Sequence, residues 1–174
     1  MYTRFKGFLT TRPLLTNCLI YGTFYSGAEF SQQTILRKIR TEKSSPYDFP
    51  LIGRYFVLGS TVFPVSLYYW FRFLDKKMVG TAMKVVVPKV IVDQLVSSPY
   101  MLATFFIGMS IMEGKKDIFE ECKEKMWPSY QKSCMFWLPA QAINFALIPS
   151  SFRVAWVATC SLAWINILCL IKRE

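Results

Sequence analysis

Polar and ionisable side chains interrupt the apolar stretches of this chain, and they are its only candidates for chemistry. The stretch WLPAQAINFALIPSSFR keeps the amides Gln141 and Asn144 and the cation Arg153. Earlier apolar stretches hold the acids Glu29 and Asp93. In water such residues would be ordinary surface, whereas inside a bilayer each needs a partner or a water-filled cavity.

These intramembrane polar residues are predicted to face the bundle interior or a water-filled cavity, paired with one another. The set is Glu29, Gln33, Asp93, Gln94, Gln141, Asn144 and Arg153. Asp93 is expected on a wet path or in a charge pair. The counter-ions expected for the acids are Arg54 and Arg153, because charges at membrane depth usually pair. In the alternative, the amides only cross-link neighbouring helices, at about 0.6 kcal/mol each.

No catalytic or cofactor motif accompanies these residues. The sequence has no histidine, which is the commonest general base and metal ligand, and no G-x-S-x-G, HExxH or glycine-rich phosphate loop. Its five cysteines show no CxxC spacing. We therefore expect no enzyme activity, no catalytic residue, no metal and no cofactor.

Composition decides in which solvent the chain folds. Of its 174 residues, 53% are hydrophobic and 18% charged, against about 45–50% and about 25% in an average soluble domain. So short a chain could not hide that much apolar surface in water. The net charge of +10 is spread in short basic clusters between apolar runs. Such clusters suit lipid head groups and not nucleic acid.

The apolar runs predict an all-α integral membrane bundle in a single domain, 1–174, with four to five transmembrane helices. Each of the first three runs is long enough to cross the hydrocarbon core, and the last two form short spans or a hairpin around Pro149. The expected spans are 13–36, 49–71, 85–112, 133–149 and 152–171.

A polar segment, 115–127, is predicted to form an amphipathic helix at the membrane surface. Ile118, Cys122 and Met126 fall on one face of it, and Lys and Glu occupy the other. A helix docked on a soluble partner is the alternative.

Prolines and tryptophans add two expectations. Helix kinks are predicted at Pro64, Pro99, Pro139 and Pro149. A helical proline leaves a carbonyl without its donor, and Gln141 and Asn144 could supply one. Interfacial anchoring is expected of Trp70, Trp127, Trp137 and Trp164.

Several of these residues also carry a family resemblance over nearly the whole chain. The Mpv-seventeen/peroxisomal membrane protein twenty-two family shares the spacing of Trp137, Gln141, Asn144, Phe145, Pro149, Arg153 and Trp164. Its K-x-x-x-D-Q followed by proline resembles Lys89, Asp93, Gln94 and Pro99, and it usually has Asp and Gln at the positions of Glu29 and Gln33. The stretch FIGMSIMEGKKDIFEECKEK is most similar to the Mpv-seventeen-like branch. The family's Gly-Pro of the second span is Phe63-Pro64 in this chain.

The resemblance implies a membrane channel of low selectivity for small solutes, linked to organelle homeostasis and reactive-oxygen metabolism. In such a channel the intramembrane polar residues would line or brace the path, with Asp93 attracting cations and Arg153 holding Asp93 or admitting anions. It implies residence in the mitochondrial inner membrane or, alternatively, the peroxisomal membrane. The basic start of the chain, with Arg4, Lys6 and Arg12 before any acid, favours mitochondria. Membrane lipids and small solutes are the expected partners, with the chain alone, as a homo-oligomer or beside another membrane protein. The alternative is a non-conducting membrane interaction or assembly protein.

Overall fold

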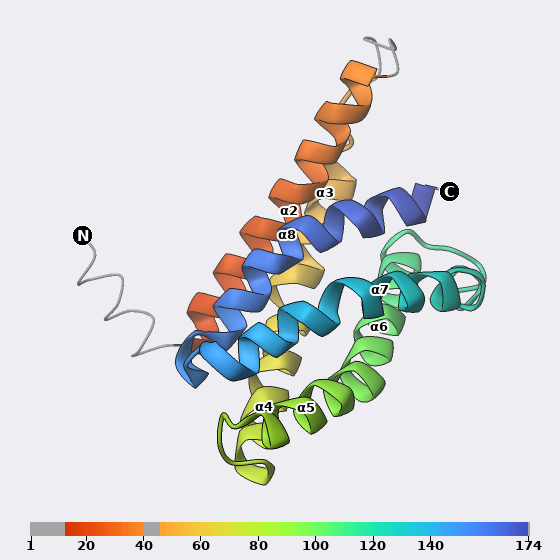
Figure 1. The fold of residues 1–174 in the computed structure, drawn as a ribbon. Coiled ribbons are helices and arrows are strands. Elements are labelled where there is room, and N and C mark those ends of the chain that lie inside the picture. Colours follow the sequence, from red (N-terminus) through yellow and green to blue (C-terminus); the bar gives the residue numbers. More distant parts are fainter. Residues whose placement is uncertain (1–12, 40–45, 174) are drawn as a thin grey trace, which may run out of the picture.

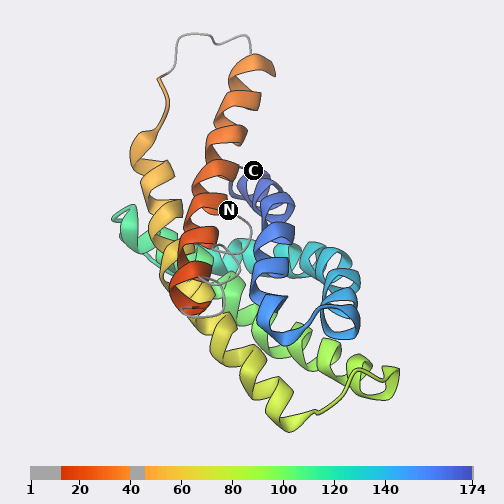
Figure 2. The same cartoon turned by 90° about the vertical axis from the view of Figure 1, so that its left-hand side faces the viewer.

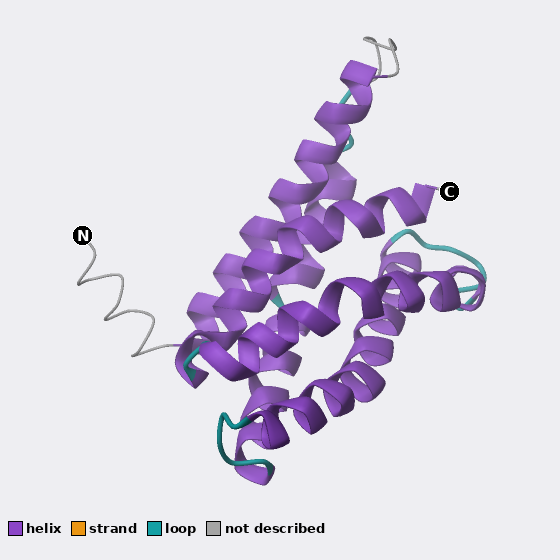
Figure 3. Ribbon diagram, viewed as in Figure 1, coloured by secondary structure: helices purple, strands orange, loops and turns teal. Residues whose placement is uncertain are grey.

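The computed structural model describes residues 13–39 and 46–173, and helices make up nearly all of this part (Figure 1). In chain order the elements are α2 (Pro13–Ile39), α3 (Phe49–Ser60), α4 (Val62–Lys77), α5 (Met83–Val92), a π-helix, η1 (Asp93–Ser97), α6 (Ser98–Met112), α7 (Glu120–Leu147), a 3-10 turn, η2 (Ser150–Phe152), and α8 (Arg153–Arg173). No strand occurs in the described residues (Figure 3). The predicted all-α membrane bundle is confirmed.

Three helical segments of the described chain are long and apolar enough to cross a membrane. They are Phe49–Lys77, Met83–Met112 and Ser150–Leu168. Helices α2 and α7 have sufficient length, at 27 and 28 residues, but they are more polar. A count of four to five crossings therefore stays a prediction that depends on whether α2 and α7 also span.

Helix α7 joins two elements that were expected to be separate. The amphipathic segment 115–127 and the span 133–149 were predicted as distinct helices, whereas α7 runs from Glu120 to Leu147 without interruption. The prediction of two helices was based on the change from polar to apolar residues between the two segments. Such a change alters the surroundings of a helix, but it leaves the backbone hydrogen bonds of the helix intact.

The predicted kink residues occupy different kinds of position. Pro64 lies in the first turn of α4, just after the break at Thr61, and Pro149 separates α7 from η2. Pro139 lies inside the continuous α7. Pro99 follows the π-helix, in which the amide of Ser98 donates to the carbonyl of Asp93, five residues back. A π-turn frequently marks a functional site.

The helices form a bundle whose interior is rich in aromatic side chains. Helix α2 packs against α3 and α8, and α7 packs against α5, α6 and α8 (Figures 1 and 2). Buried rings in the core include Tyr21, Tyr25, Tyr55, Phe63, Phe71, Phe105, Phe106, Phe145 and Trp164. The ends of α4 and α7 and the starts of α5 and α8 lie at one end of the bundle (Figure 1). Residues 113–119, between α6 and α7, lie at the other end.

Gly59 permits the closest approach of α2 and α3, which gives a prediction on stability. A methyl group at Gly59 would lie 2.7 Å from Cβ of Tyr25 and 3.0 Å from the carbonyl oxygen of Tyr21. Because a backbone atom cannot retreat as a side chain does, Gly59→Ala should lower the free energy of unfolding by about 1–3 kcal/mol. Thermal unfolding in detergent measures this loss.

Gly53, on the same helix α3, provides the matched control. A methyl group there meets nothing within 4 Å, so Gly53→Ala should be neutral or stabilising by up to about 1 kcal/mol. Equal melting temperatures for the two variants would contradict close packing at Gly59.

Candidate functional site

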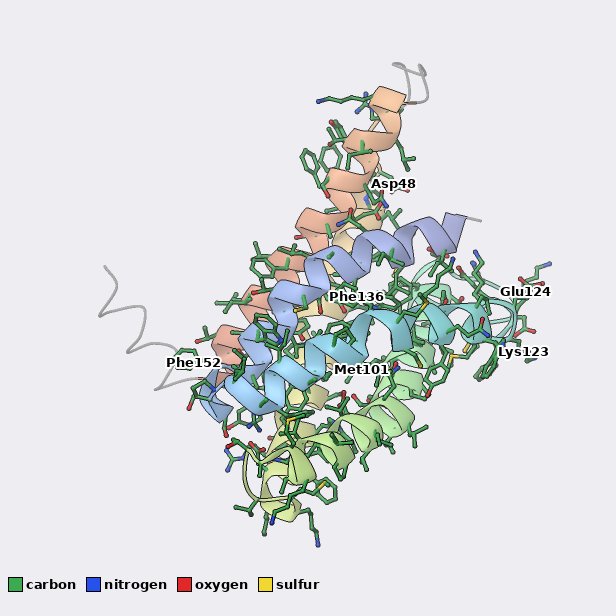
Figure 4. The ribbon with its side chains drawn as sticks, viewed as in Figure 1. Asp48, Met101, Lys123, Glu124, Phe136 and Phe152 are labelled. Carbon is green, nitrogen blue, oxygen red and sulfur yellow. The ribbon has the colours of Figure 1, made fainter. Side chains whose placement is uncertain are left out.

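A cavity lies between α2, α4, η1, α6, α7 and α8, and apolar side chains make up most of its wall. Its volume is about 60 Å³, enough for a few water molecules, because one water needs about 10–15 Å³ on this measure. Met101, labelled in Figure 4, lines it where α6 faces α7. The polar lining consists of Asp93, Gln94, Ser97, Ser98, Ser133, Gln141 and Ser161. The rest of the wall is apolar and consists of aromatic rings (Tyr21, Tyr25, Phe63, Phe105, Trp137 and Trp164) and of the aliphatic side chains of Leu67, Met101, Leu102, Val157 and Leu168.

The buried carboxylate of Asp93 is held in the cavity wall by neutral donors. The indole Nε1 of Trp70 donates to Oδ1 at 2.7 Å, and Nε2 of Gln141 donates to Oδ2 at 2.8 Å. The Nδ2 group of Asn144 donates in turn to Oε1 of Gln141 at 2.7 Å. No cation in the described part of the chain forms an ion pair with Asp93. An ionised carboxylate held in this way keeps its negative potential, which favours cations in the cavity.

Gln94 ties the π-helix to α7 through a second set of contacts. Its Nε2 lies 3.2 Å from Oγ of Ser98 and 3.3 Å from Sγ of Cys134. The hydroxyl oxygens of Ser98 and Ser133 lie 2.6 Å apart. The hydroxyl of Tyr130 donates to the carbonyl of Gln94 at 3.2 Å. The π-helix thus turns two successive polar side chains, Asp93 and Gln94, toward α7.

A charge cluster of Asp75, Lys89 and Arg153 joins α4, α5 and α8 outside the cavity. The ammonium of Lys89 lies 2.9 Å from Oδ1 of Asp75, and the guanidinium of Arg153 donates to the same oxygen. The side chains of Lys89 and Arg153 are 2% and 4% exposed, against 26% for Asp75. Both cations also approach the ring of Phe145, within 5.7 and 5.3 Å of its centroid. Two buried cations therefore share one carboxylate.

Glu29 and Gln33 lie on α2 and do not line the cavity. Gln33 donates to Glu29 at 3.0 Å and exchanges hydrogen bonds with the backbone of Asp48. Asp48, labelled in Figure 4, caps α3 by accepting from the amide of Leu51 at 2.9 Å. The pair thus anchors the start of α3 to α2.

Comparison with known proteins identifies the family. The Mpv17 / PMP22 family model matches residues 110–169; this is the Mpv-seventeen/peroxisomal membrane protein twenty-two family of the sequence resemblance. An "Mpv17-like protein" of Xenopus laevis is 33% identical over 167 residues, covering 96% of this chain and 80% of that protein. The chain belongs to the Mpv17/PMP22 family.

Further relatives are similar over most of the chain. An "Mpv17-like protein" of Bos taurus is 33% identical, over 93% of this chain and 79% of that protein. "Protein sym-1" of Neurospora crassa is 28% identical, over 94% of each chain. No solved structure gives a significant match. The residues matched by the Mpv17/PMP22 model include Gln141, Asn144 and Arg153.

The expected counter-ions differ from those in this family member's structure. Arg153 pairs with Asp75 and not with Asp93, and Arg54 forms no ion pair with Glu29 or Asp93 among the described residues. Position along the helices gives the reason. Arg153 begins α8 beside the last turn of α4, whereas Asp93 lies ten residues into the segment that starts with α5.

Two other expectations about the site are also wrong. Gln141 and Asn144 donate to side-chain oxygens and not to carbonyls freed by proline. Trp70 binds Asp93 inside the bundle, and Trp137 and Trp164 line the cavity. Of the four tryptophans expected at interfaces, Trp127 is mostly exposed, at 67%.

Sequence reasoning missed Trp70, Asp75 and Lys89 as site residues. Lys89 did carry a signal, because it is the only charge within the apolar run VVVPKVIV, and a lone buried cation requires a partner. Trp70 and Asp75 carried none. Their partners are 23, 14 and 78 residues away in sequence, so only the packing of the helices brings them together.

Trp70→Phe tests the hydrogen bond that orients Asp93. Phenylalanine keeps a ring but removes the indole N–H, leaving a buried carboxylate with one donor fewer. We expect the free energy of unfolding to fall by about 1–3 kcal/mol. Thermal unfolding is the measurement, and Trp127→Phe at the exposed tryptophan should change stability by less than about 0.5 kcal/mol. Equal effects would show that the ring alone accounts for the stabilisation by Trp70.

Proposed function

We propose that the protein is an organellar membrane channel of low selectivity for small solutes. The observation that carries the proposal is the buried carboxylate of Asp93, which lines a cavity together with other polar side chains and is held only by neutral donors. Ionisable residues at membrane depth usually face the bundle interior or a water-filled cavity. The serines and amides around the cavity would replace part of the hydration shell of a passing solute.

In this proposal the cavity widens during conduction. With a volume of about 60 Å³ it takes only a few waters, so larger solutes require neighbouring helices to part. The break at Thr61 and the π-helix η1 interrupt two of the membrane segments beside the cavity. Helices bend most readily at such irregularities, so these are the proposed hinges.

The proposed setting is the mitochondrial inner membrane, with the peroxisomal membrane as the alternative. Relatives with printed names that include "sym-1" and "PXMP2/4 family protein" support an organellar membrane. The basic start, which favours mitochondria, lies outside the described residues. There the channel would contribute to organelle homeostasis and reactive-oxygen metabolism, without catalysis, as a homo-oligomer or beside another membrane protein.

A non-conducting interaction protein is the second candidate. The hydrogen bonds of Asp93 link α4, η1 and α7, as purely structural cross-links would. Phe119 and Trp127, near the start of α7, are exposed and would contact a partner.

Single-channel current from the purified protein in a planar bilayer separates the two candidates. The channel proposal expects discrete openings and leakage of small solutes from liposomes. Silence from protein that is folded and inserted would overturn it. Loss of co-purifying proteins from a Phe119→Ser, Trp127→Ser variant would then support the interaction protein.

A further inference from the structure

We propose that one end of the bundle binds the head group of an anionic phospholipid. This basic end comprises the exposed residues Arg72, Lys76, Lys77 and Lys84 and the buried residues Lys89 and Arg153, around a single acid, Asp75. It is formed by the end of α4, the start of α5 and the start of α8 (Figure 1). The inference does not depend on conduction.

The buried part of the basic end carries a surplus positive charge. Lys89 and Arg153 both bond Oδ1 of Asp75, and no other described acid forms an ion pair with either cation. One carboxylate neutralises only one of them. The remaining charge is buried, and in a medium of low dielectric constant it acts over a longer range than in water.

The exposed part combines cations with apolar side chains. Lys76 and Lys77 end α4, and Lys84 lies in the first turn of α5. Between them Val79 and Met83 are 79% and 64% exposed. A soluble anion would use only the lysines. A phospholipid uses both, because its phosphate meets the ammonium groups while its acyl chains cover the apolar side chains.

Residues 113–125, between α6 and α7 and in the first turns of α7, lack this character. Residues 113–125 mix acids with lysines, and the ammonium of Lys115 lies 2.6 Å from Glu121, a hydrogen bond that raises the pKa of Lys115. Lys123 and Glu124 lie in this segment, far from Phe152 at the start of α8 (Figure 4). Of these two segments, only the basic end carries an excess of positive charge over acid.

Lipid retention measured by native mass spectrometry tests the inference. The delipidated protein in neutral detergent is titrated with phosphatidylglycerol or with zwitterionic phosphatidylcholine. The variant Lys76→Gln, Lys77→Gln, Lys84→Gln removes the exposed lysines of the basic end. The control Lys38→Gln, Lys116→Gln, Lys123→Gln removes as much charge from exposed positions outside the basic end.

Each lysine near an anionic head group contributes about fivefold in affinity. We expect the wild type and the control to retain phosphatidylglycerol in preference to phosphatidylcholine, and the variant to bind it on the order of a hundredfold more weakly. The single change Lys84→Gln should cost about fivefold, which keeps the test valid if the triple variant unfolds. Equal affinity in variant and control would overturn the proposal.

A competition experiment separates a lipid from a soluble phosphate. Glycerol phosphate at millimolar concentration should leave bound phosphatidylglycerol in place, because it lacks acyl chains to cover Val79 and Met83. Displacement at concentrations equal to those of the lipid would reassign the basic end to a soluble anion, contrary to the proposal.

Discussion

Asp93→Asn is expected to reduce the preference of the channel for cations over anions on the order of tenfold. A unit charge about 6 Å from a passing ion stabilises a cation by about 0.7–3 kcal/mol at an effective dielectric constant of about 20–80. Asparagine keeps the size of the side chain and removes that charge. Reversal potentials in asymmetric salt measure the change.

The amide at this position also strains the hydrogen-bond network. Trp70 and Gln141 both donate to the carboxylate, and an asparagine offers one acceptor and one donor. Gln141 can turn its amide to accept, but Asn144 then loses the oxygen to which it donates. A stability loss of about 1–3 kcal/mol should accompany the change in selectivity.

Glu29→Gln is the control, because it removes a buried acid that does not line the cavity. Its selectivity should equal that of the wild type. If Asp93→Asn opened with wild-type selectivity, the result would support the channel but contradict a position of Asp93 in the wall of its conduction path. A shift in Glu29→Gln of the same size would show that net charge, and not position, sets selectivity.

The fold class and most helices could be predicted because each membrane helix is determined by the residues of its own stretch of sequence. A run of about 20 apolar residues requires a helix, since its backbone groups find no partner in lipid. Span 85–112 was accordingly expected within two residues of Met83–Met112. Helix α7 was predicted as two helices because its start is polar. The polarity of a segment indicates what surrounds it and not where the helix ends.

The site was predicted in part, for a physical reason. Asp93, Gln94 and Gln141 were expected along one path and do line one cavity, and Asn144 joins them through Gln141. A polar residue within an apolar run can be recognised from the sequence as one that needs a partner. Which partner it binds depends on how far along the bundle each residue lies relative to residues on the neighbouring helices. The spacing of residues in the sequence does not give this relative position.

The structure separates the charge of Lys89 on α5 from that of Asp93 at the start of η1. Asp93 places negative charge in the cavity, and Lys89, one helical turn earlier, belongs to the cluster with surplus positive charge. The two residues share one helix face, and yet Lys89 bonds Asp75. Because Lys89 pairs with Asp75, Asp93 has no ion-pair partner among the described residues and its carboxylate stays available to the cavity. Asp75 therefore affects the charge in the cavity as well as the charge in its own cluster with Lys89 and Arg153.

Asp75→Asn is therefore expected to be the most destabilising single change to a charged residue here, at about 3–5 kcal/mol. It leaves the buried cations Lys89 and Arg153 without a carboxylate, although the shape of the side chain is kept. Thermal unfolding in detergent should show a large fall in melting temperature.

Lys89→Met makes the test specific, because it removes one of two cations that share Asp75. Arg153 and Asp75 then form a neutral pair, and the flexible methionine fills the space beside Phe145. We expect a loss of less than about 1.5 kcal/mol. Adding Lys89→Met to Asp75→Asn should recover part of the stability, because one unpaired cation costs less than two. If Asp75→Asn and Lys89→Met lowered the free energy of unfolding equally, and their losses added in the double variant, the two cations would not share the carboxylate. The three side chains would then contribute to stability independently.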